Sequence, residues 1–144
     1  MKITTGRIAA LAAAFSTLPV FAAEQIKVIE HPVGETTVDL GPKGDSIGDL
    51  LVFANGVFDA ADKVQVGKDQ GYCVRTVVGK SWECFWTLIL KGGQITVEGP
   101  FMDEGDSLFA VTGGTGKYAG AKGSMKLHSR DAKSSSYDFV YDLL

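Results

Sequence analysis

Along most of this chain, apolar and polar residues alternate one by one in short runs that end at glycine. Near the C-terminus, for example, Tyr137, Phe139 and Tyr141 alternate with Asp138 and Asp142. A period of two residues places successive side chains on opposite faces of a β-strand. After the first two dozen residues, no segment of ten or more residues shows the period of an amphipathic helix. The sequence therefore predicts an all-β protein.

Eight or so such runs follow one another at regular spacing. We expect strands over residues 25–31, 36–40, 50–58, 64–78, 82–90, 94–101, 108–112, 125–130 and 137–143. Such a series is typical of a β-sandwich or of a closed barrel. Eight strands can close around side chains or one small ligand, and no strand shows the proline or heavy lysine content of a protected edge. We therefore predict an eight-stranded antiparallel β-barrel.

The N-terminal segment, residues 1–22, has the pattern of an export signal. Met1–Arg7 carries two positive charges and no acid, Ile8–Leu18 is mostly apolar or small, and Val20-Phe21-Ala22 offers a cleavage site. A membrane span is the alternative, but the apolar run is shorter than the ~20 residues that a bilayer requires. We predict a mature domain of residues 23–144 without a membrane span, secreted or periplasmic, in an oxidising compartment.

The charge of this predicted domain limits its partners. Without Lys2 and Arg7, the chain holds 12 Lys and Arg against 17 Asp and Glu, a net charge of −5. Nucleic acid would require a clustered basic patch, and an anionic membrane surface would repel a chain of this charge. We therefore expect no nucleic acid and no anionic membrane surface as a partner.

Three motif-like features favour structural explanations. Residues 113–120 (GGTGKYAG) contain a G-x-G-x-x-A string, but an alternating strand follows where a dinucleotide site needs a helix, so we expect a tight structural loop. Asp45 and Asp49 lack the further oxygen ligands of a calcium loop and are expected to cap a loop. His31 and His128 lack the spacing of zinc ligands. We expect no metal and no cofactor.

The two cysteines lie in neighbouring predicted strands. Cys73 and Cys84 are separated by a turn near Gly79-Lys80, and a loop over residues 77–80 would place them opposite one another. An even number of cysteines in an exported chain favours a disulfide. Two buried thiols, or one reactive thiol, remain as alternatives.

Two polar residues share a face with apolar neighbours. Glu30 alternates in phase with Ile26 and Val28, and Asn55 with Leu51 and Phe53. If these faces line the barrel, Glu30 is buried, and a buried carboxyl needs a partner or acquires a raised pKa. Arg75, on the same face as Cys73, is a candidate counter-ion for Glu30. A satisfied structural polar group is the alternative for each of them.

Four segments together resemble the allene oxide cyclase family. They are residues 48–55 (GDLLVFAN), 71–74 (GYCV), 95–101 (ITVEGPF) and 110–123 (AVTGGTGKYAGAKG), in the family's order and at similar spacing. The last of them also looks like the glycine loop of dirigent proteins. The resemblance is greatest to the signal-bearing bacterial members, the allene oxide cyclase barrel-like proteins.

The resemblance implies a calycin-type barrel, often trimeric, whose apolar lumen guides the cyclisation of an unstable epoxide. It implies that Glu30 stabilises positive charge and that Asn55 holds a water molecule. Both would be catalytic residues. The expected substrate pocket contains Phe53, Cys73, Arg75, Trp86 and Phe101. A carboxylate in a medium of low dielectric stabilises a nearby cation, and apolar walls exclude water.

The chain also departs from the family pattern. The family's pocket tyrosine falls on Phe101, a second asparagine falls on Pro32, and the position of Cys84 is a small residue in the family. A bond between Cys73 and Cys84 would leave no free pocket thiol. These changes put in doubt the epoxide cyclisation that plant members of the family carry out. They leave the other expected pocket residues in place.

Two functions follow as hypotheses. In the first, an exported barrel binds a small hydrophobic or phenolic molecule and steers its cyclisation or coupling, which would make it an isomerase. In the second, the barrel is a non-catalytic extracytoplasmic ligand-binding or structural module. A lumen plugged by Trp82, Trp86 and Tyr141 would favour the second. A homotrimer is expected from the resemblance, and outward-facing Phe85 and Ile89 fit it.

Overall fold

The alternating runs of the sequence form β-strands in residues 23–144, which are the residues that this computed structural model describes. The strands are β1 (Glu24–His31), β2 (Glu35–Val38), β3 (Leu50–Phe58), β4 (Gln65–Val77), β5 (Ser81–Leu90), β6 (Gly93–Met102), β7 (Ser107–Gly116), β8 (Gly123–Ser129) and β9 (Tyr137–Leu143). The predicted export signal over residues 1–22 lies outside the described residues.

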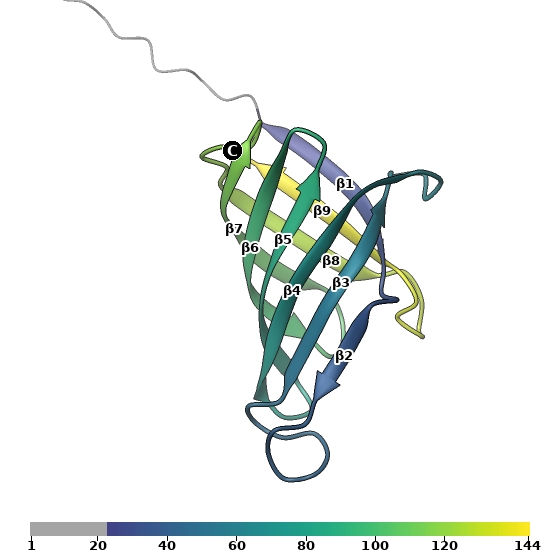
Figure 1. The fold of residues 1–144 in the computed structure, drawn as a ribbon, viewed down its shortest axis with the longest axis vertical. Helices are drawn as coiled ribbons and strands as arrows, with labels where there is room; N and C mark the ends of the chain where they lie inside the picture. Colours follow the sequence, from purple (N-terminus) through teal and green to yellow (C-terminus); the bar gives the residue numbers. More distant parts are fainter. Residues whose placement is uncertain (1–22) are drawn as a thin grey trace, which may run out of the picture.

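The strands close into a barrel (Figure 1). They follow the order β1-β9-β8-β7-β6-β5-β4-β3-β2, and β1 also pairs with β3, always in antiparallel fashion. β1 pairs with residues 56–58 of β3, and β2 pairs with residues 50–53 of the same edge. β1 and β2 therefore act as one wall strand that is interrupted at residues 32–34, which we call the wall break. The barrel has eight strand positions, as predicted.

Aromatic side chains fill the middle of the barrel. Trp86 lies edge-on to Phe109, with ring centroids 4.4 Å apart, and 5.6 Å from the ring of Phe139. Its indole nitrogen donates a hydrogen bond to the hydroxyl of Tyr141, which is fully buried. Burial raises the pKa of that phenol, so it stays neutral. These rings separate the two ends of the barrel.

The glycine-rich loop between β7 and β8 covers one end of the barrel. Its Tyr118 is buried in the core, and the backbone N–H of Lys117 donates a 2.8 Å hydrogen bond to Gly92. Gly114 must be glycine, because a Cβ there would lie 2.3 Å from the carbonyl oxygen of Tyr118. Positive φ angles at Gly116 and Gly120 fold the loop back. The prediction of a tight structural loop is therefore confirmed, and we call this end the glycine end.

A loop before β3 lies at the other end, where β2 and the start of β9 are also found (Figure 1). The carboxylate of Asp49 is buried and accepts hydrogen bonds from the backbone N–H groups of Leu40 (2.9 Å) and Ser46 (2.8 Å). These hydrogen bonds lower the pKa of Asp49. The prediction that this carboxylate caps a loop is confirmed.

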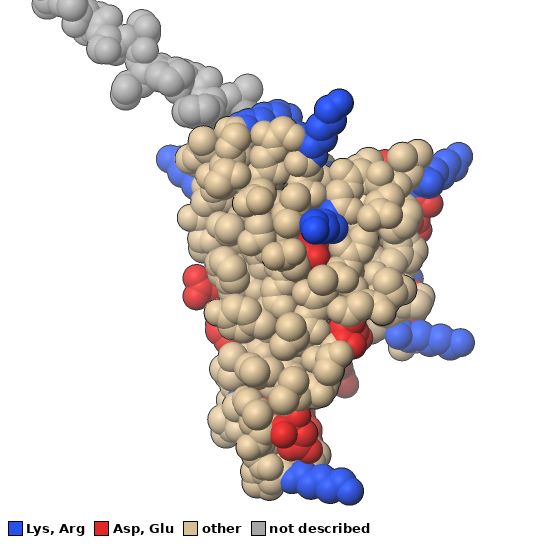
Figure 2. All heavy atoms as spheres, viewed as in Figure 1, with Lys and Arg blue, Asp and Glu red and all other residues tan. Residues whose placement is uncertain are grey.

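Charged side chains are scattered over the outer surface. On the face in Figure 2, Lys, Arg, Asp and Glu are scattered over a mostly uncharged wall. Within residues 23–144, no helix has the length and apolarity that crossing a membrane would take.

Candidate functional site

A cavity of about 130 Å³ lies inside the barrel at the end opposite the glycine end. It is bordered by the wall break and by the starts or ends of several strands, and we call this end the cavity end. Its acidic lining residues are Glu30 and Glu35, and its aromatic lining residues are Phe53, Trp86, Phe101, Tyr137 and Phe139. A dry cavity of about 150 Å³ takes up benzene in another protein, so this cavity has the size of roughly one ring.

Glu30 points into this cavity from β1, as the alternation predicted. The residue is only 4 % exposed. Burial, and next the nearby carboxylate of Asp69, raise the pKa of Glu30 to about 8, although a hydrogen bond from Asn55 acts in the opposite direction. The carboxyl is therefore mostly protonated at pH 7. A positive charge placed beside it would favour the carboxylate.

Asn55 holds Glu30 and the wall break together. Its side-chain Nδ2 donates a hydrogen bond to Oε1 of Glu30. Its Oδ1 accepts hydrogen bonds from the backbone N–H groups of Val33 (3.1 Å) and Gly34 (2.8 Å). A Cβ on Gly34 would lie 2.4 Å from the carbonyl oxygen of Ala54, so only glycine allows this close approach. One side chain thus fixes the carboxyl and the shape of the wall.

Asp69, on β4, carries a second buried carboxyl and lies next to Asn55 of β3. The two residues are direct partners in the β3–β4 ladder, and Asp69 has no exposed surface. Among residues 23–144, neither of its carboxyl oxygens has a hydrogen-bond partner. Burial raises its pKa to about 7. The interior of the barrel therefore contains two carboxyls, Glu30 in the cavity lining and Asp69 behind Asn55.

Aromatic side chains form much of the cavity wall. Phe53, Trp86 and Phe101, which were expected in a substrate pocket, line the cavity. Sequence reasoning missed Tyr137, whose ring lies edge-on to Phe101 at a centroid distance of 6.3 Å. Tyr137 supplies a phenol to the cavity beside Phe101. Its alternation with Phe139 and Tyr141 was the signal that could have revealed it.

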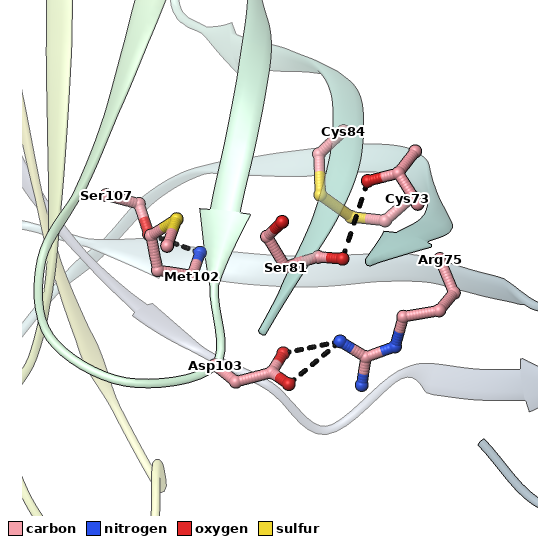
Figure 3. The surroundings of a disulfide bond; sticks show 8 residues. Cys73, Arg75, Ser81, Cys84, Met102, Asp103 and Ser107 are labelled. Atoms are coloured by element: carbon pink, nitrogen blue, oxygen red, sulfur yellow. Dashed lines mark hydrogen bonds and ion pairs between the residues drawn. A yellow bond between two sulfur atoms is a disulfide. The ribbon is translucent and has the colours of Figure 1, made fainter. Parts of the chain in front are cut away.

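The disulfide forms part of the cavity wall (Figure 3). Cys73 and Cys84 are direct partners in the β4–β5 ladder and are bonded to each other. Both residues are 2 % exposed. The predicted disulfide is confirmed, and the cysteine in the pocket is therefore not a free thiol.

The hypothesis that Arg75 is the counter-ion of Glu30 is wrong. The guanidinium of Arg75 binds Asp103 at 2.7 Å (Figure 3). It also binds Asp45 at 2.6 Å and stacks on the ring of Trp82. Arg75 does not line the cavity. Its long side chain extends to the rim of the cavity end. Two loop carboxylates, which remain partly exposed to water, neutralise its charge there. Glu30 is thus left without a cationic partner among the described residues.

The lining of the cavity carries acidic groups and no Lys, Arg or His. Residues 23–144 also contain no group of three or more His, Cys, Asp or Glu side chains that could hold a metal ion. A carboxyl in such a place can donate a hydrogen bond when protonated, or stabilise positive charge when ionised. The aromatic faces can do the latter as well.

Several solved structures share this fold. A pyocyanin demethylase has a TM-score of 0.74 and 24 % identity, and the alignment covers 84 % of this chain and 100 % of that one. The pterocarpan synthase dirigent protein PsPTS1 has a TM-score of 0.71 and 16 % identity over 88 % of this chain and 96 % of that one. An exo-specific intermolecular Diels-Alderase has a TM-score of 0.64 and 14 % identity, over 85 % of this chain and 98 % of that one.

A match to a family model establishes the relationship. The model described as allene oxide cyclase matches residues 30–131, which include β3 to β8 and both Glu30 and Asn55. The match covers well over half of the sequence and agrees with the closed barrel that the strands form. The chain therefore belongs to the allene oxide cyclase family.

Proposed function

We propose that this barrel binds a small hydrophobic or phenolic molecule in the cavity and steers its cyclisation. The observation that carries the proposal is a buried carboxyl, Glu30, held by Asn55 at the edge of an aromatic cavity. Positive charge that develops on a reacting molecule would be stabilised by this carboxyl at low dielectric. The described walls would hold the molecule in one conformation and keep water away.

The names of structural neighbours support the direction of this proposal. Two of them are pterocarpan synthase dirigent proteins and another is a Diels-Alderase. Each of these names refers to the formation of a ring or to the steering of a product. Since their identity to this chain is low, they support a reaction class and no particular substrate.

The test is stereocontrol over a substrate that forms a cation. An allene oxide generated in situ closes to a cyclopentenone, and the enantiomeric excess of the product is measured with and without the protein. We expect one enantiomer in excess from the wild type. Glu30→Gln is expected to keep the fold and give racemic product, since it removes the one lining carboxyl that Asn55 holds.

Three further variants complete the assay. Phe101→Tyr is expected to maintain or raise the enantiomeric excess, because it adds a hydroxyl beside Tyr137. Glu98→Gln is the matched control, because Glu98 is exposed on β6, and no change is expected. Asn55→Ala is expected to weaken turnover less than Glu30→Gln, and its folding must be checked because it frees two backbone N–H groups. Racemic product from the wild type, equal to a buffer blank, refutes cyclisation of that substrate.

A non-catalytic binding module is the second candidate function. Trp86 and Tyr141 fill the middle of the barrel, which leaves a cavity of about 130 Å³. Trp82 is not part of the cavity lining; its ring packs against Arg75 and the edge of the core. Native mass spectrometry of the protein purified from the periplasm or the medium, combined with the stereocontrol assay, distinguishes the two functions. A retained small molecule with racemic product would favour the binding module.

Export of the chain is part of the proposal. It rests on the pattern of residues 1–22, and a disulfide is typical of oxidising compartments. The test is the N-terminal sequence of the protein recovered from the periplasm or the medium, which is expected to start at Ala23. Recovery of the uncleaved chain in the cytoplasm would contradict it.

Assembly as a homotrimer is also proposed. The outer wall carries a cross-strand row of three large apolar residues, Val52 on β3, Tyr72 on β4 and Phe85 on β5. Val52 and Tyr72 are 44 % and 50 % exposed in the single chain. We expect light scattering to give three times the mass of one chain at micromolar concentration. Tyr72→Lys should then shift the mass toward that of one chain, and a wild type with the mass of one chain would rule out the trimer.

A further inference from the structure

Every ionisable group on the lining of the cavity is acidic or phenolic. Glu30 contributes a buried carboxyl, Glu35 contributes an exposed carboxyl at the edge of the lining, and Tyr137 contributes a phenol. Asp69, the ladder partner of Asn55 on β4, adds a third carboxyl, which is buried. The charge of Arg75, which also points inward on β4, is already neutralised by Asp45 and Asp103 at the rim. No described cation is therefore left to balance the carboxyls of the interior.

Aromatic rings surround the same space. Phe53 and Trp86 lie with their centroids 6.1 Å apart, and Phe101 and Tyr137 lie 6.3 Å apart. The face of an aromatic ring carries negative potential, and several rings around a pocket form the usual binding site of a quaternary or protonated amine. From about pH 8 upward, where Glu30 ionises, a ligand with a carboxylate or phosphate would meet repulsion from the carboxylates.

We infer that the cavity selects a small organic cation, a protonated or quaternary nitrogen on about one ring, over neutral and anionic molecules of the same size. This inference rests on the proposed function, because it names the class of ligand for the same cavity. It goes further in that the ligand carries its positive charge before any reaction. The bound cation would take the place of the counter-ion that Glu30 lacks.

Binding of such a cation would release a proton. The groups that face Glu30 are Asn55 on β3, Asp69 on β4, Glu35 on β2, and the phenols Tyr137 and Tyr141 on β9. None of them is positive, and the pKa of Glu30 is about 8 in the free protein. A cation favours the carboxylate, so at pH 7 Glu30 must lose its proton when the ligand binds. Affinity for the cation therefore rises with pH and levels off above about pH 8.

The experiment compares molecules that differ in charge and little in shape. Calorimetry measures the binding of N-methylpyridinium, of toluene as its neutral isostere, of phenol, and of benzoate as the anion. We expect N-methylpyridinium to bind roughly tenfold more tightly than toluene at pH 8, and benzoate not to bind. We also expect its dissociation constant to increase by up to about tenfold for each pH unit below 7.

Proton release is measured in the same titrations. The enthalpy of binding is recorded in two buffers of different ionisation enthalpy at pH 7, and its difference gives the number of protons released. We expect about one proton for N-methylpyridinium and none for toluene. Glu30→Gln should abolish the release and most of the preference for the cation while keeping the binding of toluene. Glu35→Gln should weaken the cation less, and Glu98→Gln should change nothing.

The possible outcomes separate this inference from the proposed function. If toluene or phenol binds as tightly as N-methylpyridinium, or if no proton is released, the cation inference is overturned and the apolar or phenolic ligand stands. If none of the molecules binds at millimolar concentration, the proposed binding function falls with it. If Glu30→Gln does not fold, the buffer dependence of the wild type and the comparison of charges still decide the matter.

Discussion

The two ends of this barrel differ in the residues that they bury and in how their polar groups are paired. The glycine end joins its backbone groups to one another, for example Lys117 to Gly92 and Tyr118 to Thr115, and its buried side chains are apolar or phenolic. The cavity end encloses Glu30 and Asn55, with Asp69 behind them, and carries a disulfide in its wall. The cavity end therefore buries polar groups at a cost in stability. Removing a buried carboxyl there should stabilise the fold, whereas disturbing the close packing of the glycine end should destabilise it.

The largest effect is expected at the glycine end, from Gly114→Ala. The added Cβ would lie 2.3 Å from the backbone oxygen of Tyr118 and 2.7 Å from that of Gln94, so the backbone must move. We expect the free energy of unfolding to fall by about 3 kcal/mol or more, measured by urea denaturation. Gly113→Ala is the matched control, because its Cβ would meet only the hydroxyl of Thr96 at 3.4 Å. Equal losses for the two variants would show that the loop does not close this end tightly.

The second prediction is a gain in stability at the cavity end from Glu30→Gln. The pKa of Glu30 is about 8 in the folded protein and 4.5 when unperturbed, so folding favours the protonated form. This contribution is complete below about pH 4.5 and is lost as the pH rises to about 8. Glu30→Gln should therefore add about 2–3 kcal/mol to the free energy of unfolding at pH 7, and little at pH 4.5. Parallel pH profiles for the two proteins would contradict this.

Asp69 should act in the same direction as Glu30. Its pKa of about 7 lies above the ordinary value of 3.8, so it too destabilises the fold as the pH rises. Asp49 acts in the opposite direction, because its lowered pKa makes its contribution vanish in acid. We expect the wild type to be most stable in mildly acidic solution, and Asp69→Asn to flatten the decline toward pH 8.

The third prediction concerns the disulfide in the cavity wall. Replacing both Cys73 and Cys84 with alanine should lower the free energy of unfolding by about 2–3 kcal/mol, because the unfolded chain loses the constraint of a closed loop. Urea denaturation of the double variant and of the oxidised wild type gives the difference. Two free thiols in the mass of the non-reduced wild type would remove the basis of this prediction.

The smallest effect is expected from exposed ion pairs at the glycine end. Lys117 binds Glu24 at 2.8 Å, but both side chains are largely in water. Lys117→Met should leave the midpoint of thermal unfolding unchanged within error. Arg75→Met at the cavity end should lower it clearly, because Asp45 and Asp103 lose a partner that is 9 % exposed. Similar shifts for the two variants would mean that the ends do not differ in this respect.

Strand alternation predicted most of the fold and part of the site. The period of two residues placed Glu30 and Asn55 inside, and the turn near Gly79 placed Cys73 opposite Cys84. The ion-pair partners of Arg75 could not be predicted from strand alternation. A long side chain reaches partners on loops, and the position of Asp45 and Asp103 depends on how those loops fold.

Asp69 was missed for a different reason. Its neighbours on the inner face are Gly67 and Gly71, which carry no side chain and give no alternation to read. The size of the cavity also depends on the orientation of Trp86, which sequence does not specify. The parts of the site that strand periodicity determines were therefore predictable, and the parts set by side-chain reach and packing were not.

The three hydrogen bonds of Asn55 limit which positions of this barrel can be substituted independently during evolution. The aromatic residues that line the cavity can be exchanged one at a time, because each exchange reshapes the cavity and leaves the hydrogen bonds of the wall strand in place. A change at Asn55 would release Glu30 and the backbone N–H groups of Val33 and Gly34 in a single step. Changes at Phe53, Phe101 or Tyr137 would therefore reshape the cavity within an intact barrel, whereas a change at Asn55 would require a rebuilt wall.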